Sequence, residues 1–181
     1  MCLQYVNTVI ELYSDVKEDR MKGSRSYIGA FDRLAVSENR DGKLELPGFV
    51  AVARFNFLGT SVPEKKQISF VERKRGCLEV KLLLSKCSGE AELQQAAVLG
   101  EFEIDLAKLE GNIKKACFHF LNYTHICNVG RMILEPGAGS YVVKAVARWK
   151  SLSDILEDET EFTVQSMCYL EVCDANAQNG S

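Results

Sequence analysis

The chain has 181 residues, of which 46% are hydrophobic and 26% are charged, as in an ordinary globular domain. This apolar content excludes a wholly disordered chain, and only 13 glycines and 3 prolines exclude collagen-like and low-complexity classes. The 22 basic and 25 acidic residues give a net charge of −3, which argues against a dedicated nucleic-acid-binding protein because such proteins carry a basic excess.

The cysteines and the N-terminal residues predict the cellular compartment. Seven cysteines are present, an odd number without the dense spacing of a small secreted disulfide scaffold. The first residues lack the basic region of a signal peptide, and no stretch of 18 apolar residues predicts a transmembrane helix. We therefore expect a cytoplasmic protein with reduced thiols.

The first element, at residues 3–16, fits two kinds of structure. Val6, Ile10 and Tyr13 have helical spacing, but the segment is rich in Val, Thr, Tyr and Ile, which favour strands. We expect an N-terminal strand within 9–13 and keep a helix over 3–16 as the alternative.

Apolar and polar residues alternate in five later segments, at 49–57, 78–84, 98–106, 141–149 and 161–173. Successive side chains of a strand point to opposite faces, so this pattern buries one face of a sheet and exposes the other. In the third segment the residues expected to face inward are Val98, Gly100, Phe102, Ile104 and Leu106.

Weaker strand candidates and turns complete the pattern. The turns include Asn39-Arg40-Asp41-Gly42, where Gly42 can take a positive φ,. Roughly nine short strands separated by turns predict an all-β fold, an antiparallel β-sandwich with little helix. Short helical turns remain alternatives at 91–97 and 151–158. The weaker strand candidates lie at 31–36, 67–72, 115–121, 125–128 and 131–134.

We expect one domain over residues 1–173, with the element at 3–16 packed on it, and a flexible tail at 174–181. Tyr141 follows Leu134 and Pro136, and in immunoglobulin-like domains a tyrosine near the start of a strand bonds back to the preceding corner. A core tyrosine after a Pro-Gly turn is the alternative. The segment LGEFEIDLAKL at 99–109 has the rhythm of a C2 strand entering its loop, so the pattern resembles immunoglobulin-like and C2-like sandwiches.

The one cluster of metal-ligating residues is Cys117, His119, His125 and Cys127, which reads C-x-H-x5-H-x-C. If the two halves form a hairpin centred on Asn122, all four side chains share the outer face of the sheet. Two sulfurs and two nitrogens suit zinc, and a cysteine beside a histidine also suits a thiol nucleophile.

Two observations oppose a zinc site. The spacing matches no common Cys2His2 pattern, and ligands about 6.5–7 Å apart along a strand converge on one ion only with a bulge or a strong twist. Two exposed histidines with half-buried thiols are therefore the preferred interpretation, and zinc is kept as the alternative cofactor.

No phosphate-binding loop and no nucleophile elbow is found. We therefore expect a protein that is not an enzyme: a non-catalytic interaction or assembly module whose partner is another protein, or a second copy bound through an edge strand. The alternative is a zinc- or thiol-dependent protein centred on the Cys/His cluster. A third option is a C2-like binder of membranes or phosphates that uses the basic tips. One basic run contains Arg20, Lys22 and Arg25, and the other contains Lys65, Lys66 and the tip at 72–76.

Overall fold

The computed structural model describes residues 2–60, 77–88, 92–105, 108, 111–113, 118–150 and 161–175. Side chains are described for 7–57, 77–88, 93–105, 108, 122–148 and 167–175. The strand expected at 67–72, the helical turn at 151–158, the basic tip at 72–76 and the end of the tail lie outside the described residues.

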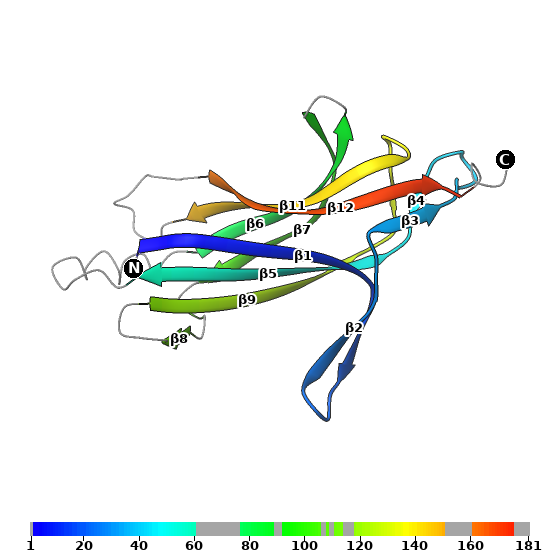
Figure 1. Ribbon diagram of the computed structural model, residues 1–181. Coiled ribbons are helices and arrows are strands. Elements are labelled where there is room, and N and C mark those ends of the chain that lie inside the picture. Colours follow the sequence, from blue (N-terminus) through cyan, green and yellow to red (C-terminus); the bar gives the residue numbers. More distant parts are fainter. Residues whose placement is uncertain are drawn as a thin grey trace.

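Two five-stranded sheets make up the described fold (Figure 1). All strand neighbours are antiparallel except the parallel pair β3–β12. A third, two-stranded sheet joins β10 (Met132–Ile133) to β4 (Glu45–Leu46). Sheet 1 has the order β2 (Ser24–Ala30), β1 (Cys2–Asp19), β5 (Phe49–Thr60), β9 (Phe118–Val129) and β8 (Gly111–Ile113). Sheet 2 has the order β3 (Arg33–Val36), β12 (Glu161–Asp174), β11 (Gly139–Lys150), β6 (Cys77–Ser88) and β7 (Glu92–Asp105).

The inner faces of the two sheets share a single hydrophobic core, which confirms the all-β sandwich. The alternation in the sequence identifies most of it: Ala51, Phe55 and Phe57 of β5 and Leu82 of β6 are at most 1% exposed, whereas Asn56 on the opposite face of β5 is exposed. Burial of these side chains supplies the main favourable free energy of folding. No helix of the described residues is long and apolar enough to cross a membrane.

At the N-terminus the structure has a strand and not a helix. β1 is longer than the strand expected within 9–13 and covers Cys2–Asp19. Residues 92–97, where a helical turn was an alternative, belong to β7. The turn at Asn39 is confirmed, because Gly42 has a φ of 71° and its amide donates to the Asn39 carbonyl at 3.1 Å.

The expected inward face of β7 is wrong at Val98. The register of β7 against β6 shifts so that Gly100 lies opposite Leu82 and Val98 lies opposite Leu83. Leu99 is therefore the extra residue of a β-bulge, which changes the face of the residues before it. As a result Leu99 is buried, and Val98 is 45% exposed on the outer face.

Tyr141 is both a core residue and a corner residue. Its side chain is fully buried, and its hydroxyl donates a hydrogen bond to the carbonyl of Gly137 in the turn before β11. Lys86 Nζ donates to the carbonyl of Pro136 in the same turn. Both interpretations weighed for Tyr141 therefore hold: it is a core residue after a Pro-Gly turn, and it also bonds back to the corner, which fixes the turn that leads into β11.

Candidate functional site

The structure does not contain the hairpin expected around Asn122. Residues 118–129 form one continuous strand, β9, and Asn122 pairs with Asn56 of β5 in its middle. His119 and His125 are six residues apart on this strand, about 20 Å at 3.3 Å per residue. They are therefore too far apart to bind one metal ion.

His125 and Cys127 do not lie on the outer face of the sheet, where a hairpin would have placed them. Cys127 is buried at 8% exposure and His125 is half-buried, while Asn128 on the opposite face of the strand is exposed. His125 and Cys127 therefore point into the sandwich. Cys117 lies outside the described residues, and His119 is described only by its backbone.

His125 and Cys127 close the side of the sandwich between β9 and β7. The His125 ring stacks on Phe102 with a centroid distance of 3.7 Å and an angle of 9° between the planes. The Cys127 thiol donates to the carbonyl of Leu99 at 3.1 Å, so it satisfies the carbonyl at the β7 bulge. Gly100 makes room for this contact, because a Cβ atom there would lie 2.6 Å from Cys127 Sγ.

Cys127 and His125 have the properties of buried packing residues and not those of a catalytic or metal site. Burial raises the pKa of the Cys127 thiol, which is the opposite of what a thiolate nucleophile requires. Burial also lowers the pKa of His125. No group of three or more His, Cys, Asp or Glu side chains within the described ranges is placed to hold a metal ion.

A different surface has the properties of a binding site, and it lies on the outer face of sheet 2. Tyr169 is 66%, Met167 48% and Val98 45% exposed. The strand register places them in neighbouring rows across β7, β6, β11 and β12: Val98 lies opposite Leu83, which is half-buried, and Tyr169 lies opposite Val142, which is fully buried. We call Val98, Met167 and Tyr169 the outer apolar face.

Lys144 crosses the middle of this face, between Leu83 of β6 and Met167 of β12. Its positive charge is the one charged group in that row of side chains, since Leu83 lies in turn opposite Val98. The centre of the outer apolar face therefore combines apolar contact area with one cationic hydrogen-bond donor.

A shallow cavity of about 310 Å³ adjoins the outer apolar face at Tyr169. Its polar side chains are Asp32, Arg33, Ser140 and Glu171. Ser140 Oγ donates to Glu171 at 2.7 Å, and the Glu171 amide donates to the Asp32 carbonyl at 2.8 Å. The outer apolar face thus ends at a rim that carries both signs of charge.

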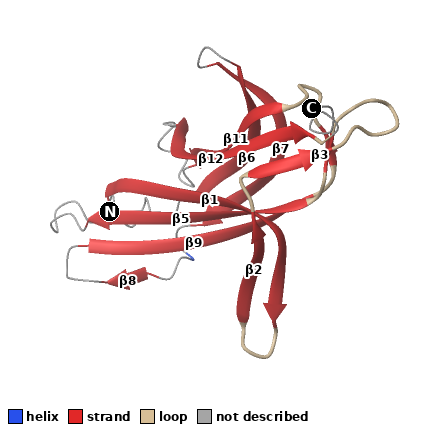
Figure 2. Cartoon of the chain, turned by 45° about the vertical axis from the view of Figure 1, so that its right-hand side comes forward, coloured by secondary structure: helices blue, strands red, loops and turns tan. Residues whose placement is uncertain are grey.

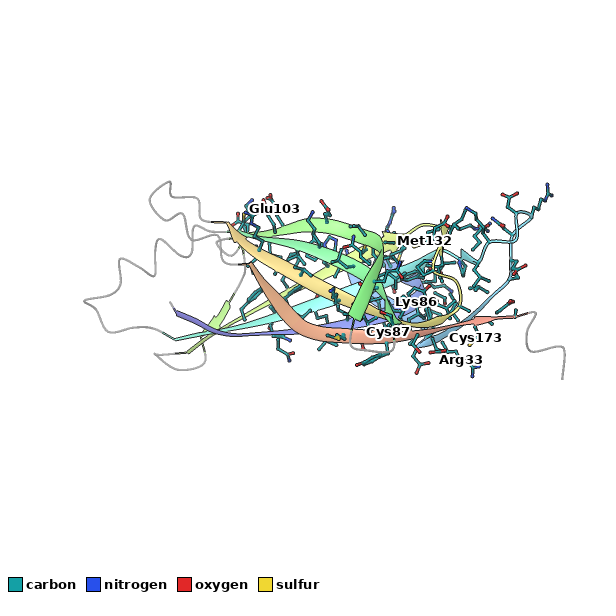
Figure 3. The ribbon with its side chains drawn as sticks, turned by 90° about the horizontal axis from the view of Figure 1, so that it is seen from above. Arg33, Lys86, Cys87, Glu103, Met132 and Cys173 are labelled. Atoms are coloured by element: carbon teal, nitrogen blue, oxygen red, sulfur yellow. The ribbon has the colours of Figure 1, made fainter. Side chains whose placement is uncertain are left out.

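Arg33 is held at this rim by a cysteine from the next strand. Its Nε lies 3.2 Å from Sγ of Cys173, and the two residues are close together at the end of β12 (Figure 3). The hydrogen bond to Cys173 is the largest of the interactions that raise the pKa of Arg33. An arginine side chain is charged at every physiological pH, so the rim of the cavity carries a fixed positive charge here.

Sequence reasoning missed this surface, although one signal was present. Met167, Cys168, Tyr169 and Leu170 are consecutive, so both faces of this part of β12 are apolar. A strand that buries only one face alternates with polar residues. Four adjacent apolar residues therefore indicate that Met167 and Tyr169, which point outward, belong to an exposed apolar surface.

Comparison of the chain with protein-family models, with curated proteins and with solved structures finds no match in any of the three.

Proposed function

We propose that this protein is a non-catalytic interaction module of the immunoglobulin-like or C2-like kind, and that its outer apolar face binds another protein. The observation that supports this proposal is the gathering of Val98, Met167 and Tyr169, each at least 45% exposed, on one face of sheet 2. Clustered apolar side chains on a surface are typical of interaction sites.

The composition of this surface agrees with a protein partner. Tyrosine and methionine are enriched in the centres of protein interfaces, and a polar rim surrounds such centres. Here Tyr169 and Met167 supply the apolar area on β12, and Arg33 and Glu171 form the polar rim next to Tyr169. Exposed tyrosines that become fully buried on binding carry much of the binding free energy.

The bond from Tyr141 to the preceding turn supports the immunoglobulin-like interpretation, because that contact is a feature of those domains. The cytoplasmic location stays a prediction.

The test compares two charged substitutions on the outer apolar face with a matched one elsewhere. Met167→Asp and Tyr169→Asp place a carboxylate in the proposed interface. Ile133→Asp, at a residue that is 46% exposed on β10, is the control. Proteins retained by each purified variant from native extract are quantified by mass spectrometry against wild type.

We expect a defined set of proteins to be retained by wild type and by Ile133→Asp and lost from both face variants. For a purified partner, the loss of a central tyrosine contact weakens binding by about 30-fold or more, the equivalent of 2 kcal/mol. A cooperative thermal unfolding transition for each variant is the check that it is folded. Equal retention by all four proteins contradicts the proposal.

A further inference from the structure

β1 and β2 form an arm that leaves the sandwich. The distal half of β1, 13–19, pairs with β2, whereas the pairing of β1 with β5 ends at Tyr13 opposite Val50. Six of the seven residues of β2 are exposed, and Figure 2 shows the hairpin projecting away from both sheets. Within the described part of the chain, no strand pairs with the outer side of β2.

Side chains at the base of the arm hold it in this extended position. The rings of Tyr13 and Tyr27 lie 5.1 Å apart, and the Arg54 guanidinium lies 5.3 Å from the Tyr27 ring centroid. Arg54 also forms an ion pair with Glu11. The arm is thus anchored to the outer face of sheet 1, while its tip is surrounded by solvent.

A two-stranded ribbon of this kind is at best marginally stable in water, and three or more strands are needed for independent stability. The backbone N–H and C=O groups on the open side of an edge strand are a template for another strand. The arm therefore gains stability from any strand that pairs with β2.

The other edges among the described strands are poorly suited to pairing. β8 has three residues and β3 has four. β7 is long, but its register shifts twice along β6, and its sequence contains Glu92, Glu101, Glu103 and Asp105. Bulges, short strands and repeated charges are the devices that keep edge strands from pairing.

β2 has few of these devices. Its sequence, SRSYIGA, contains one charged residue, and that residue, Arg25, already pairs with Glu18 at 2.9 Å. It contains no proline, and its pairs with β1 run without a register shift from Asp15–Ile28 to Asp19–Ser24; Gly29, with a φ of 69°, departs from extended backbone only near the base of the arm. The four consecutive residues from Ser26 to Gly29 are uncharged.

We propose that β2 pairs antiparallel with β2 of a second copy of this chain, so that two arms form a four-stranded sheet about a twofold axis near Tyr27. This inference is independent of the outer apolar face, which lies on the other sheet. A symmetric antiparallel pair sets a strand against its own reverse, and isologous contacts of this kind are the commonest in homodimers.

The sequence of β2 is compatible with antiparallel pairing to the β2 strand of a second copy. With Tyr27 at the centre, Arg25 lies opposite Gly29 of the second copy, so the two Arg25 backbones are about 13 Å apart along the strands. That separation exceeds the screening length of about 8 Å at physiological salt. Tyr27 lies opposite its own copy, and aromatic cross-strand pairs stabilise sheets.

The test is the oligomeric state of the full chain with and without a lysine on β2. In Ile28→Lys the new charge lies opposite Asp15 within the arm, which preserves the hairpin. In the proposed dimer, however, the lysines of the two copies would be diagonal neighbours across the β2–β2 pair, about 7–8 Å apart, and would repel each other. Met21→Lys, at a fully exposed residue of the turn, is the matched control. Sedimentation equilibrium over a range of concentrations measures the dimer dissociation constant.

We expect wild type and Met21→Lys to dimerise equally, and Ile28→Lys to dissociate at least about tenfold more readily. Hydrogen exchange of wild type adds a measurement that needs no variant: the β2 amides become protected as the concentration rises. A wild-type protein that stays monomeric at every concentration overturns the proposal, as does a dimer that Ile28→Lys leaves unchanged. Tyr169→Asp keeps the dimer if the two surfaces are separate, so failure here is distinguishable from failure of the outer apolar face.

Discussion

Gly100 and Cys127 provide a double-mutant test of how the two sheets are joined. A Cβ atom at Gly100 would lie 2.6 Å from Cys127 Sγ and 3.7 Å from Cys127 Cβ. The first distance is a clash and the second is an ordinary van der Waals contact. The sulfur atom alone therefore determines whether residue 100 can be larger than glycine.

Gly100→Ala should destabilise the protein by about 1–3 kcal/mol, the usual cost of overpacking a well-packed core. The thiol must move, and it then loses its hydrogen bond to the carbonyl of Leu99. Cys127→Ala should also destabilise, by about 1–3 kcal/mol, because the buried Leu99 carbonyl loses its donor.

Gly100→Ala should raise the free energy of unfolding, instead of lowering it, when Cys127 is also replaced by alanine. Once Cys127 is alanine, the new methyl group meets only a Cβ atom at 3.7 Å. Gly100→Ala then restricts the unfolded chain without a clash, which stabilises by about 0.4–1 kcal/mol where the backbone permits. Urea unfolding of wild type, both single variants and the double variant gives the coupling energy. Equal destabilisation by Gly100→Ala in both backgrounds would refute the contact between the sheets.

Three further predictions concern Tyr141 at its turn, the buried ring of His125 and the β1–β2 arm. Tyr141→Phe should lower the free energy of unfolding by about 0.5–1.5 kcal/mol, because the hydrogen bond to Gly137 is lost,; unchanged urea unfolding would contradict this. Because burial lowers the pKa of His125 from 6.5, the unfolded chain takes up a proton first as the pH falls, so wild-type stability should drop between about pH 7 and pH 5. His125→Gln should remove that part of the pH dependence, and an identical profile in the variant would be inconsistent with a buried neutral ring. Gly29→Ala should destabilise the arm by about 1–2 kcal/mol, since Gly29 has a φ of 69° and its Cβ would meet Ser14 Oγ; faster hydrogen exchange confined to 15–28 is the expected signature, and unchanged exchange there speaks against it.

The fold class followed from the sequence because period-two alternation places apolar side chains on one face of an extended strand, and packed sheets bury such faces. Phe55, Phe57 and Leu82 could be assigned to the core from parity alone, since each lies in an uninterrupted strand. The turn at Gly42 and the bond from Tyr141 to its corner were also predictable, because both depend on neighbours close in the sequence.

The errors at Val98 and at the Cys/His cluster have two physical causes. At Val98, parity gives the face of a residue only relative to its neighbours, and the bulge at Leu99 exchanges the two faces without changing the composition of the strand. At the Cys/His cluster, a shared face for the four side chains required a hairpin centred on Asn122. Pairing with Asn56 of β5 keeps it in an extended strand, and this pairing is not visible in the local sequence.

The sequence by itself determined that each extended strand buries one apolar face, because side-chain direction along a strand is a local property. Tertiary structure alone decided which strands are neighbours, that His125 and Cys127 point inward, and that Met167, Tyr169 and Val98 meet on one surface. The reason is that strand order and register are set by contacts between segments far apart in the chain, where a shift of one residue turns every side chain to the other face.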